Sequence, residues 1–265
     1  MALTLKTVGP ARGAHWVADG LRLLRRRPVA LTAPYTVFVG FALLAMVQLP
    51  PLAMLIAFSL PLFGLGYMVT SQAVLLEGPV RAAHFLEPLA APGRRRRDLL
   101  ILCLLFVALS VASALIGNVI ADGGFTALAE AMRKPGGSPT EIDQLMASRS
   151  MVGGVLFVSA AVLLIGMVFW HAPALVHWGG QGVAQSLFSS ALAVWRCRGA
   201  FLVYGLTLTA VVVGAQILIG VGVALLGTGA LGSAFAVAVG LAVSALFYVT
   251  LIFTFNDSFG SNGAP

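Results

Sequence analysis

The sequence predicts an all-α polytopic membrane helical bundle, and three observations support that fold class. Hydrophobic residues make up 59% of the chain and charged residues only 9%, whereas soluble domains carry roughly 25% charged residues. The mean hydropathy is +0.98. Four long windows also lack Asp, Glu, Lys and Arg altogether: residues 28–76, 99–121, 150–195 and 199–256. The chain therefore has too few polar residues to cover a soluble globule.

These windows hold six spanning helices, because about 20 apolar residues in a helix cross a hydrocarbon core of about 30 Å. The first and last windows are long enough for two helices each, and the others provide one continuous apolar tract each. A β-barrel would need strands of about 10 residues with alternating polarity, and tracts such as LLILCLLFVALSV at 99–111 lack that alternation. We therefore expect transmembrane helices at 29–48, 51–76, 99–120, 151–176, 200–226 and 233–255.

The distribution of basic residues predicts the orientation of these spans. Thirteen of the sixteen Lys and Arg residues lie before residue 28, in the 77–98 loop or in the 177–198 loop. The 121–150 loop carries the other three, and the 227–232 turn carries none. Because cytoplasmic loops are enriched in Lys and Arg, both termini should face the cytoplasm of a bacterial inner membrane. The 121–150 loop should then be periplasmic.

The 121–150 loop should itself contain two short helices. Phe125, Leu128 and Met132 share one face of the first helix. The stretch Ser138-Pro139-Thr140-Glu141 fits a capping box that opens the second, with Ser138 as N-cap and Glu141 reaching back to it.

Two segments that precede spans have the pattern of amphipathic helices. Residues 183–196 (VAQSLFSSALAVWR) and residues 15–26 each divide into an apolar and a polar arc. Such helices lie in the membrane interface, where Trp and Arg side chains hold them. We therefore expect contact with the interface and with anionic headgroups from Trp16, Arg22, Arg25, Arg26, Arg27, Arg94, Arg95, Arg96, Arg97, Trp195, Arg196 and Arg198.

The same order of features recurs along the chain and predicts an internal repeat. An amphipathic helix, a basic cluster and a helical hairpin occur at 15–76 and again at 183–255. The middle segment, 79–176, has a basic cluster but a poorer amphipathic helix that is broken by Pro88. The chain is therefore expected to form three hairpin units in parallel orientation within a single membrane domain.

The arginine clusters have two interpretations. Nucleic-acid binding needs basic residues that face phosphates from a folded module, whereas these arginines directly adjoin apolar spans. We expect them to mark the cytoplasmic side and to attract anionic headgroups, at about 1 kcal/mol per basic residue near the surface. The predicted partner of this surface is the lipid bilayer with its anionic phospholipids, and not nucleic acid.

Three residues are candidates for chemistry of their own. His171 and His177, in FWHAPALVHW, are six residues apart and lie about 240° apart around a helix. No neighbouring Cys or carboxylate completes a metal site with them, so the membrane interface at the end of the fourth span is their expected place. Cys197 lies between Arg196 and Arg198, a setting that favours a thiolate, but it belongs to no recognisable catalytic motif. We therefore predict no catalytic residue, no metal site and no cofactor.

The middles of the predicted spans carry no ionisable residue. Proton- and sodium-coupled transporters usually rely on intramembrane carboxylates, so the sequence disfavours that class. Small residues crowd the last two spans, among them Gly214, Gly220 and Gly240, and such residues allow close helix packing. Packing within the bundle is their expected use, and a homo-oligomer face is the alternative.

Two segments carry a resemblance to known proteins. The N-terminal LKTVGPARGAHWVADGLRLLRRRP and the stretch FWHAPALVHWGGQGVAQSLFSSALAVWRCRGAFLVYG at 169–205 resemble an uncharacterised family of proteobacterial inner-membrane proteins. More distantly, they resemble the membrane domain attached to some glycerophosphodiester phosphodiesterases. Where that distant relative usually has Asn, this chain has Cys197, and we expect no phosphodiesterase domain. The resemblance implies a six-helix membrane protein and offers no catalytic residue.

The expected function is a non-catalytic role in the cell envelope, as a scaffold or a lipid-interacting protein. Another membrane protein or a second copy of the chain is a candidate partner. A small-solute or lipid transporter or channel is the first alternative, and polar residues that converge on a cavity between hairpins would favour it. A membrane-embedded enzyme is the second, and it would need His171, His177 or Cys197 to meet a carboxylate in space.

Overall fold

The described part of the chain folds into an all-α membrane bundle. The computed structural model describes residues 3–48, 50–90, 93–134 and 139–261. Within these residues, six helices are long and apolar enough to cross a membrane, which confirms the predicted fold class. They are α2 (Pro28–Gln48), α3 (Pro50–Leu75), α5 (Gly93–Ile120), α8 (Arg149–Phe169), α11 (Arg198–Leu226) and α12 (Ala230–Ser258).

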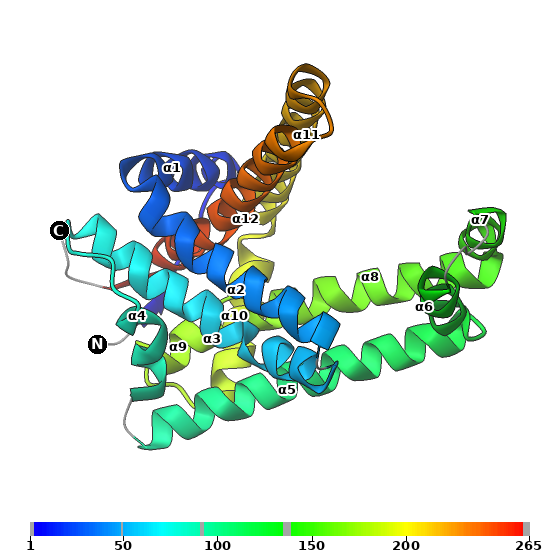
Figure 1. Ribbon diagram of the computed structural model, residues 1–265. Coiled ribbons are helices and arrows are strands. Elements are labelled where there is room, and N and C mark those ends of the chain that lie inside the picture. Colours follow the sequence, from blue (N-terminus) through cyan, green and yellow to red (C-terminus); the bar gives the residue numbers. More distant parts are fainter. Residues whose placement is uncertain (1–2, 49, 91–92, 135–138, 262–265) are drawn as a thin grey trace.

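The six helices form an open bundle of three hairpins. The hairpins α5–α8 and α11–α12 leave a shared region near the two termini and point in different directions (Figure 1), and α3 of the α2–α3 hairpin packs on both α5 and α12. Apolar side chains toward the far ends of the first two are exposed, for example Val119 (75%), Leu156 (65%) and Leu225 (81%). Because lipid solvates such side chains, these surfaces face hydrocarbon, and the contacts between hairpins concentrate near the termini.

Three short helical segments connect the hairpins in a repeating way. They are α1 (Arg12–Arg26), α4 (Ala83–Leu86) with the 3-10 turn η1 (Glu87–Ala90), and α10 (Val183–Arg196). α1 packs on α11 and α12, α4 packs on α3, and α10 packs on α8. Each segment comes directly before one hairpin in the sequence and packs on the preceding hairpin. α1 has no preceding hairpin and packs on the last one, α11–α12. The three-unit repeat is therefore cyclic, and each short segment links two hairpins.

The fourth predicted span is interrupted. α8 ends at Phe169, and a separate short helix, α9 (Ala172–His177), begins after two intervening residues with Pro173 in its first turn. Proline suits the first turn of a helix but removes a hydrogen bond from a helix interior. The fourth candidate span covers Arg149–His177 and so agrees with the predicted 151–176, but it is divided into two helices because Pro173 starts a new one.

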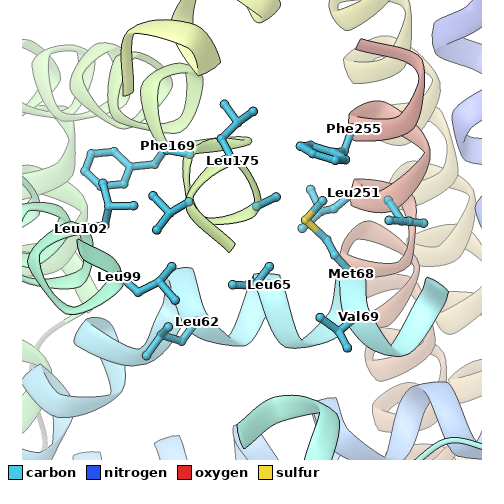
Figure 2. Packing of buried hydrophobic residues seen from close by; sticks show 14 of the residues in the cluster. Leu62, Leu65, Met68, Val69, Leu99, Leu102, Phe169, Leu175, Leu251 and Phe255 are labelled. Carbon is cyan, nitrogen blue, oxygen red and sulfur yellow. The ribbon is translucent and has the colours of Figure 1, made fainter. Parts of the chain in front are cut away.

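α9 fills the space where the three hairpins meet. Residues 172–176 are all buried, and Leu175 has no exposed surface. Figure 2 shows Leu175 surrounded by Leu65 of α3, Leu102 of α5 and Phe255 of α12, all members of one buried cluster. This short helix therefore joins all three hairpins at the end of the bundle that holds the termini.

α1 packs on protein rather than on lipid. Trp16 has no exposed surface, and its ring contacts Phe201 and Tyr204 of α11 at centroid distances of 5.2 and 6.0 Å. The polar arc of α1, which includes His15 and Arg22, faces outward. The predictions that this helix lies with its apolar face in the membrane interface and that Trp16 contacts lipid are therefore wrong, because α11 and α12 cover that face.

α10 exposes its aromatic residues and buries its small ones. Phe188 and Trp195 are 68% and 60% exposed, whereas Ser186 and Ser190 have no exposed surface. The Ser190 hydroxyl donates to the carbonyl of Met167 on α8 at 3.3 Å. Small side chains let two helices approach closely. The serine edge of this amphipathic helix therefore meets the protein, and its aromatic edge points away from it.

The two ends of the chain pair with each other. β1 (Leu3–Leu5) and β2 (Phe259–Ser261) form a two-stranded antiparallel sheet. Beside the sheet, the backbone N–H of Lys6 donates to the carbonyl of Ser258 at 2.9 Å. The first and last described segments of the chain therefore lie side by side.

The 121–150 segment contains two short helices, α6 (Gly124–Arg133) and α7 (Pro139–Ala147). They lie together at the far end of the α5–α8 hairpin (Figure 1). Ser138 and the side chain of Glu141, on which the predicted capping box depends, lie outside the described residues.

Asn118 of α5 caps α6 from outside. Its Oδ1 atom accepts from the backbone N–H groups of Phe125 and Thr126 at 3.1 and 3.2 Å. The first N–H groups of a helix have no partner within the helix. This one amide therefore satisfies two of them and fixes α6 to the end of α5.

Candidate functional site

Polar groups of the bundle gather along one face of α12 near the termini. Thr250, Thr254, Asp257 and Ser258 follow a spacing of four, three and one, which places them on one side of the helix. Both threonines and Ser258 have no exposed surface. Buried polar groups cost free energy unless they are hydrogen-bonded. Among the described residues, Ser258 Oγ has no hydrogen-bond partner. The partners of Thr250, Thr254 and Asp257 therefore show what this face does.

The two threonines bind side chains from two neighbouring parts of the bundle. The Tyr204 hydroxyl of α11 lies 2.7 Å from Thr250 Oγ1. Trp170 Nε1 donates to Thr254 Oγ1 at 3.1 Å, and His171 Nε2 lies 3.2 Å from the same oxygen. α12 is therefore tied both to α11 and to the break between α8 and α9.

His171 is enclosed by protein on all sides. Thr254 Oγ1 donates its hydrogen to the Leu251 carbonyl at 2.8 Å, so it accepts from His171, whose ring hydrogen we assign to Nε2. The rings of Phe255 and Phe259 pack edge-on against the imidazole. His171, predicted at the membrane interface from the sequence, has no exposed surface, so its side chain contacts protein and not lipid; its depth in the membrane stays a prediction.

Asp257, at the end of α12, holds α1 in place. Its Oδ2 atom accepts from Arg12 Nε at 2.5 Å and from Trp16 Nε1 at 2.6 Å. The hydrogen bond to this carboxylate raises the pKa of Arg12 above its usual value, so the guanidinium stays charged. A buried indole N–H needs an acceptor inside the protein. The Asp257 carboxylate therefore accepts hydrogen bonds from both the buried Trp16 indole and the charged Arg12 guanidinium of α1.

We expect Asp257→Ala to destabilise the protein by about 3 kcal/mol, because it leaves the Trp16 N–H buried without an acceptor and removes the hydrogen-bonded partner of Arg12, which keeps only Asp19 at 3.4 Å. Asp257→Asn keeps an acceptor oxygen for Trp16 and should cost less. The midpoint temperature of unfolding in detergent, followed by size-exclusion chromatography after heating, measures both. Glu130→Ala, which removes an exposed carboxylate of α6, is the control and should leave the midpoint unchanged. A midpoint for Asp257→Ala equal to that of the control would contradict the assignment.

The ten arginines predicted to contact lipid surround this end of the bundle, and we call them the basic rim. All ten are exposed. Their contact with headgroups stays a prediction. They are Arg22, Arg25, Arg26, Arg27, Arg94, Arg95, Arg96, Arg97, Arg196 and Arg198.

Carboxylates neutralise only part of the basic rim. Arg22 pairs with Asp19 within α1. Arg94 and Arg97 share Asp98, with nitrogen–oxygen distances of 3.9 and 3.5 Å. Among the described residues, the other seven arginines of the rim have no carboxylate oxygen within 4.0 Å. The rim therefore keeps a net positive charge.

At the junction between α10 and α11, Trp195 and Arg198 are exposed whereas Cys197 is buried. The Arg198 guanidinium lies 5.4 Å from the centroid of the exposed Trp195 ring, which is within the range of a cation–π contact. Cys197, next to both, is 1% exposed, and its Sγ donates to the carbonyl of Lys6 at 3.5 Å. A thiol enclosed in this way supports the core and is not available to an external substrate.

His177 lies apart from this core, near η1. Its Nε2 atom is 3.7 Å from the Glu87 carboxylate, so of the three candidate residues this one meets an acidic partner. Within the described residues, no group of three or more His, Cys, Asp or Glu is placed to hold a metal ion.

The polar face of α12 was not among the features predicted from the sequence. A signal for it exists, because Thr250, Thr254, Asp257 and Ser258 repeat with helical spacing at the end of an apolar span. In a segment that otherwise faces lipid or apolar side chains, such a line of polar residues predicts contacts between helices.

Comparisons with known proteins agree with a membrane protein. The chain is 27% identical to a probable inner membrane protein of Burkholderia thailandensis, over 99% of this chain and 97% of that protein. No protein-family model matches the chain, and no solved structure matches it significantly. The expected likeness to the membrane domain of glycerophosphodiester phosphodiesterases is not shown by these comparisons. The chain is thus similar over its whole length to one probable inner membrane protein.

Proposed function

We propose that this chain is a non-catalytic protein of a bacterial inner membrane, which interacts with lipids and serves as a scaffold in the cell envelope. The observation that carries the proposal is the open bundle, whose long helices expose apolar side chains while exposed arginines cluster beside the starts of α2, α5 and α11. The similarity to a probable inner membrane protein supports the location.

The basic rim supports an orientation with both termini in the cytoplasm. The rim and the paired termini lie at the same end of the bundle, and Lys and Arg are enriched on the cytoplasmic side of inner-membrane proteins. The connection through α6 and α7 would then lie in the periplasm.

Reporter fusions test this orientation. Alkaline phosphatase fused after Lys134 or Gly229 should be active, because it would be exported, and green fluorescent protein fused there should be dark. Fusions after Gly78 or at the C-terminus should give the opposite pattern. A single reversed position would refute the six-span orientation.

A transporter or channel is the first alternative function, and it requires a polar passage. α9 fills the point where the hairpins meet with buried apolar side chains. A cavity of about 220 Å³ between α3, α5, α8 and α12 is also lined mainly by apolar residues, including Phe106, Phe247 and Leu251. Such a lining suits hydrocarbon rather than a polar solute, which supports lipid interaction over solute transport.

A membrane-embedded enzyme is the second alternative, and the contact between His177 and Glu87 is the observation in its favour. The separation of 3.7 Å exceeds ordinary hydrogen-bond length, and His171 pairs with Thr254 instead of a carboxylate. A catalytic His would also need to reach a substrate. These points favour the non-catalytic proposal.

Native mass spectrometry of the protein in nanodiscs formed from its own membrane tests the proposal. A stoichiometric bound lipid or membrane-protein partner is the expected result. An empty monomer that moves a solute across liposomes would overturn it.

A further inference from the structure

A groove runs along α5 beside α3, at the basic end of the bundle. It has a volume of about 480 Å³. One wall is Phe58 of α3, and the floor belongs to α5 alone. The floor residues are Gly93, Arg96, Arg97, Leu100, Ile101 and Leu104.

The floor changes from charged to apolar along the helix. The α5 residues recur at intervals of three and one, so they form one continuous face. From Gly93 to Leu104 this face spans roughly 16 Å at 1.5 Å per residue. That length is about half of a hydrocarbon core of about 30 Å. The groove therefore has the depth of one leaflet, with its arginines at the membrane surface and its leucines inside.

The charge at the mouth of the groove is incompletely neutralised. Arg97 lies 3.5 Å from Asp98, but among the described residues Arg96 has no carboxylate oxygen within 4.0 Å. The first turn of α5 contains no acidic residue, so the arginines sit beside the positive end of the helix dipole. A bound anion would reduce the electrostatic repulsion between Arg96, Arg97 and the positive end of the helix dipole. Guanidinium groups bind phosphate through two parallel hydrogen bonds.

We propose that this groove binds one anionic phospholipid, with the phosphate on Arg96 and Arg97 and an acyl chain along Leu100, Ile101 and Leu104. The inference rests on the proposed function, because it requires the basic rim to face a leaflet that contains anionic lipids. An apolar partner helix would fit the lower part of the groove but would leave the arginines at its mouth without a counter-charge. The combination of charged mouth and apolar floor selects a phospholipid.

Native mass spectrometry with defined lipids tests this site. The protein is stripped of lipid in detergent and reconstituted in nanodiscs that contain phosphatidylglycerol and phosphatidylcholine. The number of each lipid retained on the released protein is then counted. The wild type should keep one phosphatidylglycerol in preference to phosphatidylcholine, and inorganic phosphate in excess should not displace it. Displacement by phosphate would mean that the anion alone is bound, and would overturn the proposal.

Two kinds of variant test the charged mouth and the apolar floor of the groove independently. Arg96→Gln combined with Arg97→Gln should weaken retention of phosphatidylglycerol about 25-fold, since each basic residue near the surface contributes about fivefold. Leu100→Trp fills the floor without changing the charge and should also abolish preferential retention. Ile101→Phe is a second filling variant, for use where Leu100→Trp does not elute as a folded species from size-exclusion chromatography.

Each kind of variant has a matched control. Arg133→Gln with Lys134→Gln removes the same charge at the far end of the bundle. Leu202→Trp adds the same ring to an exposed position of α11. Neither control should change lipid retention.

The outcomes distinguish this site from the broader proposal. Loss of retention in the arginine variant but not in the filling variants would overturn the groove, while lipid binding by the basic rim would stand. Equal retention of both lipids by the wild type would overturn the groove and weaken the proposed lipid interaction as well.

Discussion

Trp16→Ala should destabilise the protein by about 3–5 kcal/mol, whereas Trp195→Ala should cost less than about 1 kcal/mol. Trp16 has no exposed surface, and its N–H donates to Asp257. Its removal leaves a large cavity between α1 and α11 and removes one hydrogen bond to the Asp257 carboxylate. Trp195 is 60% exposed and contacts Arg198 from outside, so its loss opens no cavity.

The midpoint temperature of unfolding in detergent compares the two variants directly, because both lose the same side chain. Trp16→Phe, which keeps an aromatic ring but removes the N–H donor, should fall between the wild type and Trp16→Ala. Equal destabilisation by Trp16→Ala and Trp195→Ala would show that both rings are lipid anchors, as the sequence alone predicts.

These two tryptophans show why the sequence predicts elements better than contacts. Both occur in amphipathic helices with arginines near the C-terminal end. In water, an apolar face predicts a core, but near a membrane it can face either lipid or protein, because both environments accept the same side chains. The pattern therefore identified α1 and α10 as helices, and it could not decide which face of each helix meets the bundle.

Long apolar windows predicted the six spans, because the thickness of the membrane fixes the length that each helix needs. The interruption between α8 and α9, at Trp170 and His171, lies within one such window. There, hydropathy carries no signal, and Pro173 was the only local indication.

The polar face of α12 could be located from its spacing, but its partners could not. Thr250, Thr254 and Asp257 contact residues that lie far away in the sequence, such as Trp16 and Tyr204. Those pairings depend on the cyclic order in which α1 packs on the last hairpin. A sequence repeat indicates that units exist, and it leaves open which unit each short helix joins.

Gly13→Ala is expected to destabilise the protein by about 3 kcal/mol, because the site where α1 crosses α11 has no room for a methyl group. A Cβ atom at Gly13 would lie 2.0 Å from the carbonyl oxygen of Ala200 and 2.6 Å from the backbone N of Tyr204. Both atoms belong to the backbone of α11, which cannot rotate away as a side chain can. α1 would have to move outward and strain the bonds from Trp16 and Arg12 to Asp257.

Gly205→Ala in α11 is the matched control, since nothing lies within 4 Å of its added Cβ. Helix propensity alone favours Ala over Gly by up to about 1 kcal/mol, so this variant should be neutral or stabilising. The two changes add the same methyl group to helical glycines and are expected to shift the unfolding midpoint in opposite directions. A lowered midpoint for Gly205→Ala would point to a packed surface there, whereas a wild-type midpoint for Gly13→Ala would show that α1 is not held against α11. The second result would also argue against the burial of Trp16, because that ring packs on Phe201 and Tyr204 of the same helix.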